Sequence, residues 1–200
     1  MSNTLQDALK NRRSCRELTA DCPLTPAQVE ALCGFALNNV PSSFNSQSTR
    51  LVLLTGTANR TFWNIVLETL RPLVPAEKFG GTETKITLFA AGTGTILFFE
   101  DRAAIEKLQA EFPSYRDRFP AWSEHTSAMH QLALWLLLED AGCGASLQHY
   151  NPIIDQAVAQ TWNLDPTWKL IAQMPYGGIR SKPAAPEKQP LSTRLNMFSE

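Results

Sequence analysis

Apolar residues recur at helical spacing through much of this chain, and the clearest case follows Thr25. Thr25 and Gln28 stand at the spacing of a capping box, with a proline in the first turn of the predicted helix. Pro41 disfavours helical geometry at Val40, so we expect this helix to end near residues 38–39. Its apolar stripe consists of Val29, Leu32, Cys33, Ala36 and Leu37.

Further helices are predicted at both ends of the chain and in its middle. A short N-terminal helix should be capped by Ser2 or Asn3. It should bury Leu5, Ala8 and Leu9. The longest candidate, residues 121–140, is apolar almost all round from Leu132 to Leu138, which is typical of a buried central helix. We also expect helices in residues 57–71, 101–111 and 153–162, a loop from Pro75 to Gly81 with Phe79 at its tip, and either a helix or a strand in residues 82–91.

Two short apolar runs, residues 51–55 and 96–99, predict buried strands, and residues 168–174, in which apolar and polar residues roughly alternate, predict a third strand. Pro175 to Gly178 should end the last of these strands. Gly92 and Gly94 do not begin a dinucleotide-binding fingerprint. Leu97 occupies the position of the third glycine, and a strand follows where such a motif needs a helix.

Composition narrows the class of protein. The 200 residues are 44% apolar and 18% charged, which supplies enough apolar material for one packed domain. A net charge of -1 argues against a general nucleic-acid-binding protein, and no apolar run is long enough for a membrane span. The first ten residues lack a signal-peptide core, so we expect a cytoplasmic protein. Paired metal-ligand spacing is missing among the cysteines, which favours reduced thiols over disulfides or a zinc site at Cys15, Cys22, Cys33 and Cys143.

The densest charge lies in residues 10–16, where four of the seven side chains are cationic. Arginine guanidinium groups match phosphate oxygens with two parallel hydrogen bonds, and Ser14 adds a neutral donor. Each charge-assisted bond contributes about 1.5–3 kcal/mol, so two or three of them could hold a phosphate monoester. The alternative is a solvated basic turn at the end of the first helix, where cations suit the negative end of the helix dipole.

A second polar segment, residues 41–48, connects the helix after Thr25 with the strand at residues 51–55. Seven of its eight residues are proline, hydroxyl or amide types, which offer hydrogen-bond donors and acceptors without charge. A polar loop between buried elements is a place where function tends to lie. The alternative is an ordinary hydroxyl-rich turn.

Arg12-Arg13-Ser14-x-Arg16 is followed about thirty residues later by Pro41-Ser42-Ser43-x-Asn45-Ser46-Gln47. In order and spacing these two motifs resemble the FMN-dependent nitroreductase family, and the second is most similar to the subgroup named for fatty-acid repression mutants. The resemblance implies an α+β, nitroreductase-like fold in which helices wrap a small antiparallel sheet, assembled as an intertwined homodimer. It also favours a helix in residues 82–91.

The resemblance further implies the residues of an FMN site. Contacts to the phosphate and ribityl chain fall on Arg12, Arg13, Ser14 and Arg16. The loop that reaches the flavin, part of which the partner subunit usually supplies, falls on Ser42, Ser43, Asn45 and Gln47. The segment along the isoalloxazine ring falls on Leu147, Gln148 and His149. A cation from the tail normally completes the phosphate site, and Lys188 fits best, with Lys182 and Arg180 as alternatives.

The assignment of His149 stays open. His149 is as well explained by a structural role as by a flavin contact. His125 and His130 are five residues apart, which does not suit a metal site, and we expect none.

The resemblance places residues 1–178 in a single domain and residues 179–200 in an arm that packs on the partner subunit.

The function implied is that of an FMN oxidoreductase. NADH or NADPH would donate hydride, and a nitroaromatic, quinone or similar acceptor would take it at the same flavin face, which predicts ping-pong kinetics. No protein nucleophile or acid–base residue is required. One alternative is an FMN-binding regulatory protein linked to lipid signalling with little turnover, and another is a binding module for a different phosphorylated metabolite.

Overall fold

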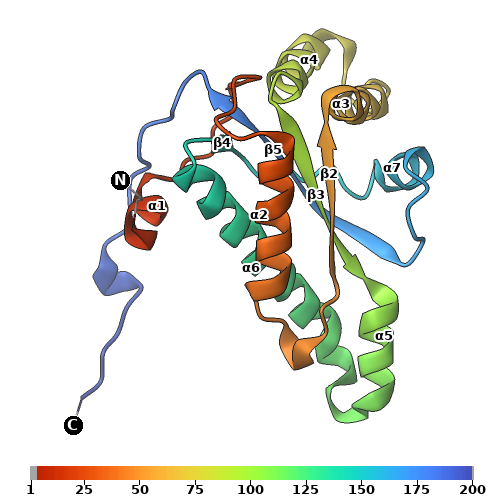
Figure 1. Cartoon of the computed structure of the whole chain (residues 1–200), viewed down its shortest axis with the longest axis vertical. Coiled ribbons are helices and arrows are strands. Elements are labelled where there is room, and N and C mark those ends of the chain that lie inside the picture. The colour runs from red at the N-terminus through yellow and green to blue at the C-terminus, as the bar shows by residue number, and fades with distance from the viewer. Residues whose placement is uncertain (1–3, 200) are drawn as a thin grey trace.

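A five-stranded antiparallel sheet lies at the centre of the computed structural model, which describes residues 4–199 (Figure 1). Strand β3 (Gly94–Asp101) pairs with β2 (Thr49–Thr55) on one side and with β5 (Trp168–Ile179) on the other. The short strands β1 (Leu18–Thr19) and β4 (Gly144–Ala145) both pair with β5. The three longer strands are those that the sequence predicts, and each extends beyond its predicted range.

Helices cover both faces of this sheet. They are α1 (Leu5–Asn11), α2 (Pro26–Asn39), α3 (Gly56–Leu70), α4 (Ala76–Ala90), α5 (Arg102–Glu111), α6 (Phe119–Asp140) and α7 (Asp155–Thr161), with short 3-10 turns η1 (Ser43–Asn45), η2 (Pro113–Arg118) and η3 (Leu191–Thr193). The capping box predicted for α2 is confirmed, since the Thr25 and Gln28 side chains each accept a hydrogen bond from the other residue's backbone N–H. Asp101 caps α5 through a bond from the Ala103 N–H.

The N-terminal helix differs from its prediction. Thr4 forms its capping box together with Asp7, whereas Ser2 and Asn3 lie outside the described residues. Only Ala8 is buried, and Leu5 and Leu9 expose 68% and 47% of their surface. The prediction that these two leucines are buried is wrong for a single chain, because α1 is short and contacts little besides α6.

The loop predicted from Pro75 to Gly81 is also wrong. Pro75 is the N-cap residue of α4, residues 76–81 form its first turns, and the helix continues to Ala90. Phe79 is buried, and the Arg71 guanidinium lies 4.5 Å from the centre of its ring. Tertiary packing around this phenylalanine therefore outweighs the low helix propensity of the two adjacent glycines.

The predicted end of the last strand at Pro175 is wrong as well, because β5 runs on to Ile179. Gly177 and Gly178 are needed here for close backbone approach. A Cβ atom on Gly177 would lie 2.3 Å from the Thr19 carbonyl oxygen, and one on Gly178 would lie 2.4 Å from the Asp21 carbonyl oxygen. These glycines therefore admit β1 and the segment after it rather than break the strand.

Alternation along β3 divides the core into two halves. Ile96 and Phe98 point toward the side covered by α2 and α6, whereas Leu97 and Phe99 point toward α3, α4 and α7. All four side chains are buried. The sheet is thus covered on both faces (Figure 1).

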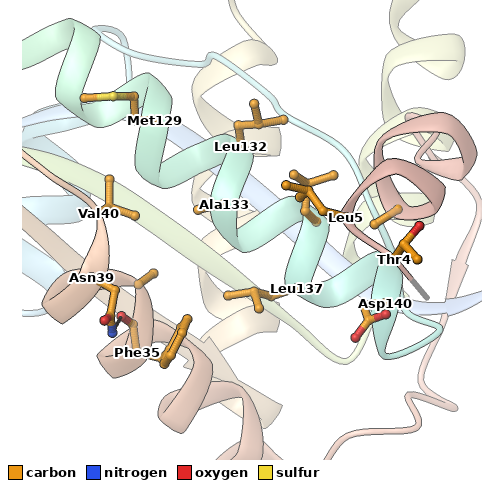
Figure 2. A pocket seen from close by; sticks show the side chains of 13 residues that line it. Thr4, Leu5, Phe35, Asn39, Val40, Met129, Leu132, Ala133, Leu137 and Asp140 are labelled. Carbon is orange, nitrogen blue, oxygen red and sulfur yellow. Dashed lines mark hydrogen bonds between the residues drawn. The ribbon is translucent and has the colours of Figure 1, made fainter. Parts of the chain in front are cut away.

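Helix α6 is buried on one side only. Leu134 and Leu138 are fully buried against the sheet, but Met129 and Leu132 expose 41% and 44% of their surface. The exposed side forms an apolar groove of about 550 Å³ with α1 and α2 (Figure 2). The prediction of a helix buried all round is therefore wrong within one chain.

Candidate functional site

The basic segment, residues 12–16, leaves the end of α1 and runs beside β4. Ser14 forms a parallel bridge with Ala145, and the Cys15 backbone N–H donates to the Ala145 carbonyl at 3.0 Å. This contact brings the basic segment next to the start of the ring segment, residues 147–149. Two of the three segments predicted to form the site therefore lie side by side in one chain.

The two adjacent arginines are held in different ways. The Arg13 guanidinium turns back and donates to the carbonyls of Lys10 at 2.8 Å and Arg12 at 2.7 Å, where the last turn of α1 leaves carbonyls unpaired. The Arg12 guanidinium lies 4.1 Å from the centre of the Trp135 ring. Arg13 is thus a cation at the C-terminal end of α1, whereas the Arg12 side chain packs against a tryptophan of α6.

The tail closes a cleft of about 550 Å³ over the basic segment. Its basic lining residues are Lys10, Arg12, Arg13, Arg16 and Lys188, and no carboxylate of the described residues lines it. Ser14 adds a hydroxyl, and tail residues 183–186 form an apolar wall. This set provides the donors that a phosphate group requires.

Of the three tail cations considered, Lys188 alone lines this cleft. Lys182 instead pairs with Glu139 at 2.5 Å. The Arg180 backbone N–H donates to the Glu17 carbonyl at 3.0 Å, and Arg180 does not line the cleft.

The ring segment presents its residues in different directions. Gln148 is buried, exchanges backbone hydrogen bonds with Gln173 at 2.7 and 2.9 Å, and donates its amide to the Ser146 hydroxyl at 3.1 Å. Leu147 packs partly against the core beneath α2 and α6. His149 is exposed. Backbone pairing with β5 therefore fixes Gln148, and His149 is the exposed residue of this segment.

The polar loop, residues 41–48, has an unusual backbone. Phe44, Asn45 and Gln47 have φ values of 55°, 49° and 47°, in the left-handed region that non-glycine residues seldom adopt. The Gln47 backbone N–H donates to the Ser42 hydroxyl at 3.0 Å. Phe44 packs against an aromatic cluster, with ring centres 4.9 Å from Phe112, 5.2 Å from Phe119 and 5.9 Å from Trp122. This packing holds the loop in its conformation.

Within one chain the polar loop and the basic segment lie at opposite ends of α6 (Figure 1). Phe44 contacts Trp122 near the start of the helix, and Arg12 contacts Trp135 near its end. The two tryptophans are 13 residues apart, which is about 20 Å along a helix axis. One chain therefore does not bring the two predicted halves of the site together.

A buried polar network under the polar loop was missed by the sequence analysis. Glu100 accepts hydrogen bonds from the Ser48 hydroxyl at 2.5 Å and the Thr49 hydroxyl at 2.6 Å, and burial raises the pKa of Glu100. The Nδ1 atom of His130 lies 3.3 Å from the Thr49 hydroxyl and 3.0 Å from the Thr126 carbonyl. Burial lowers the pKa of His130, so this ring is neutral at pH 7. His130 lines a cavity of about 300 Å³ together with Ser42 and Gln47.

Only the strand pairing could have revealed this network. Thr49 and Glu100 face each other across β2 and β3, a register that the sequence alone does not give. In the part of the chain from residue 4 to residue 199, no three His, Cys, Asp or Glu side chains gather closely enough to hold a metal. None of the helices in that range has the length and apolar character to span a bilayer.

Comparison with known proteins decides the family. The nitroreductase family model matches residues 9–178. The chain belongs to the nitroreductase family. It is 30% identical over 200 residues to the HBN1 nitroreductase of Saccharomyces cerevisiae, covering 98% of this chain and 97% of the relative. It is 29% identical over 194 residues to the nitroreductase FRM2 of the same yeast, covering 96% and 95% of the two chains.

A solved structure supports the same assignment. The nitroreductase CinD from Lactococcus lactis in complex with chloramphenicol has a TM-score of 0.88 and 36% identity, covering 98% of this chain and all of that one. A structure of the same protein with 4-nitrophenol also has a TM-score of 0.88. The nitroreductase-like α+β fold is therefore confirmed, as is the similarity to the fatty-acid repression subgroup through FRM2.

Proposed function

We propose that this nitroreductase is an FMN-dependent NAD(P)H oxidoreductase that reduces nitroaromatics, quinones or similar acceptors. The cleft between the basic segment and the tail carries the proposal. Arg12, Arg16 and Lys188 converge on it from two parts of the chain that are far apart in sequence. A solvated basic turn would not require a tail residue to complete it.

The donors in this cleft fit the phosphate end of FMN. A doubly charged phosphate needs several charge-assisted bonds, and Arg12, Arg16 and Lys188 supply cations while Ser14 supplies a hydroxyl. Arg13 has its Nη1 engaged with α1, so its share is to stabilise the turn that presents its neighbours. The adjoining ring segment, from Leu147 to His149, gives the flavin a wall next to the phosphate site.

A second copy of the chain supplies the rest of the proposed site. The polar loop lies too far from the cleft within one chain, so Ser42 and Ser43 would reach the flavin from the partner subunit of a homodimer. The apolar groove along α6 (Figure 2) is the surface that such a dimer would cover, because Phe35, Met129 and Leu132 are exposed there.

The tail fits the same assembly. Residues 180–199 are exposed throughout, and four of them are large apolar side chains: Leu191, Leu195, Met197 and Phe198. Such a segment has no core of its own, and packing on the partner subunit would bury it. Residues 1–178 would then be the domain and residues 179–200 the exchanged arm.

The chemistry that FMN supplies when bound is hydride uptake from NADH or NADPH and hydride delivery to an acceptor at the same face. CinD was solved with chloramphenicol and with 4-nitrophenol, which supports a nitroaromatic acceptor for this chain. The residues of this chain would bind and orient the cofactor, and none of them is assigned a covalent or acid–base role.

Purified protein tests the proposal directly. We expect the absorption spectrum of oxidised flavin, rapid bleaching by NADH or NADPH, and parallel double-reciprocal lines with a nitroarene as the second substrate. Intersecting lines would contradict a shared face for the two substrates. A flavin-loaded protein that NADH and NADPH bleach slowly or not at all would favour the regulatory alternative, and a colourless protein that takes up no FMN would favour another phosphorylated ligand.

A further inference from the structure

Two cysteines that are distant in sequence meet in the fold. The Sγ atoms of Cys22 and Cys143 lie 2.8 Å apart, although 121 residues separate them in the chain. A disulfide has an S–S distance of about 2.05 Å, so a movement of roughly 0.8 Å would bring the sulfurs to bonding distance. No other pair of thiols in residues 4–199 makes such a contact.

The two thiols differ in accessibility. Cys22 is half-buried in the connection between β1 and α2, and Cys143 is buried where α6 passes into β4. Burial and the neighbouring Cys22 thiol raise the pKa of Cys143. Cys22 is therefore the thiol that a small solute reaches first, and Cys143 stays protonated beside it.

We propose that Cys22 and Cys143 are a redox pair that forms a reversible disulfide in the presence of a hydroperoxide. The Cys22 thiolate attacks the peroxide O–O bond and becomes a sulfenic acid, with hydroxide or alkoxide leaving. The Cys143 sulfur then attacks the Cys22 sulfur. The S–S bond forms as the S–O bond breaks, and the hydroxyl group leaves as water with the Cys143 proton. Two thiols lose two electrons, and one peroxide is reduced.

The position of this pair gives the bond a structural effect. It would join the segment after β1 to the start of β4, whose Ala145 holds the basic segment through Ser14 and Cys15. It would also close a loop of 121 residues. Closing a long loop restricts the unfolded chain, so oxidation should raise the midpoint of thermal unfolding by about 5 °C or more.

Thiol counting and peptide mapping test the proposal on the full-length protein. The protein is treated with hydrogen peroxide, quenched, denatured and alkylated, and the alkylated cysteines are counted by mass spectrometry. We expect two of the four cysteines to resist alkylation, a linked peptide pair containing Cys22 and Cys143, and recovery of all four after dithiothreitol. Cys22→Ser and Cys143→Ser should lose both the linked peptide and the thermal shift, whereas the matched variant Cys33→Ser should keep them.

Three results would overturn the proposal. They are sulfinic acid on Cys22 with Cys143 still alkylated, a linked peptide that joins other cysteines or two chains, and retention of all four thiols under these conditions. Mapping of the unsubstituted protein decides the matter even if a variant fails to fold. The test does not depend on whether FMN is bound.

Discussion

The guanidinium of Arg12 lies 4.1 Å from the centre of the Trp135 ring. This contact links the basic segment, which is short and irregular, to α6, the longest helix of the described chain. The attraction between a cation and an aromatic face restricts the direction of the cationic side chain. Arg12 therefore reaches the cleft from a fixed support rather than from a free turn.

Removing that support should weaken FMN binding. We expect Trp135→Leu to raise the FMN dissociation constant about threefold to tenfold, which corresponds to the loss of one partly exposed cation–π contact. Trp135→Phe keeps an aromatic face and should recover most of the affinity. Quenching of FMN fluorescence during titration measures both variants. Equal affinity in the leucine variant and the unsubstituted protein would argue against this role of Trp135.

The exposed side of α6 offers a test of the dimer. Leu132 exposes 44% of its surface in the middle of the apolar groove (Figure 2). We expect Leu132→Glu to give monomers in analytical ultracentrifugation, since a charge buried without a partner costs several kcal/mol. A control variant, Leu73→Glu, changes a leucine outside the groove that exposes 60% of its surface, and should leave the assembly unaltered. Dimers that persist in Leu132→Glu would place the interface elsewhere.

Two substitutions of glycine by alanine should change the free energy of unfolding in opposite directions. Gly177→Ala would place its Cβ atom 2.3 Å from the Thr19 carbonyl, so β1 must move and we expect a loss of about 3 kcal/mol or more. Gly80→Ala lies in α4 with no atom within 4 Å of the new Cβ, and should increase stability by about 0.5–1 kcal/mol. Urea unfolding measures both. Similar stabilities for the two variants would mean that β1 is not closely packed.

The buried carboxyl of Glu100 predicts a dependence of stability on pH. Burial raises its pKa above the ordinary value of 4.5, so the folded protein holds this proton more tightly than the unfolded chain does. The contribution of Glu100 to stability therefore falls as the pH rises from the ordinary pKa of the unfolded chain toward the higher pKa of the folded protein. Glu100→Gln is neutral throughout, and we expect its stability relative to the unsubstituted protein to increase between pH 4.5 and pH 7.5. A difference that stays constant in urea unfolding at the two pH values would contradict the prediction.

Local patterns were enough to predict the main elements. The capping box at Thr25 and Gln28, the strand at residues 51–55 and the long helix in residues 121–140 each depend on neighbours in sequence. The basic segment could be singled out for the same reason, because four of the seven residues from 10 to 16 are cationic. Predicting a role for Lys188 required the family resemblance. In the structure Lys188 lines the same cleft as Arg12.

Features set by contacts between distant residues could not be predicted. In the sequence Gly177 and Gly178 suggest the end of a strand. Their close contacts with the backbone of β1 and the segment after it, which explain the two glycines, are visible only in the structure. The pairing of Thr49 with Glu100 depends on strand register, and the contact between Cys22 and Cys143 depends on the whole chain between them. The distance between the basic segment and the polar loop likewise depends on the length and path of α6.

The central claim is that the basic segment of one chain and the polar loop of its partner bind one FMN. Arg12→Ala with Arg16→Ala impairs the first, and Ser42→Ala with Ser43→Ala impairs the second. Each altered chain alone should bind FMN weakly. Arg60→Ala, on α3 and away from the cleft, is the control for lost charge and should bind normally.

Co-expression of the two double variants with different affinity tags gives heterodimers for FMN titration. One site of each heterodimer then carries both defects and the other carries neither, so we predict tight FMN binding at about half the stoichiometry of the unsubstituted dimer. Heterodimers that bind no more FMN than either parent would contradict the claim, because both elements of each site would then come from the same chain.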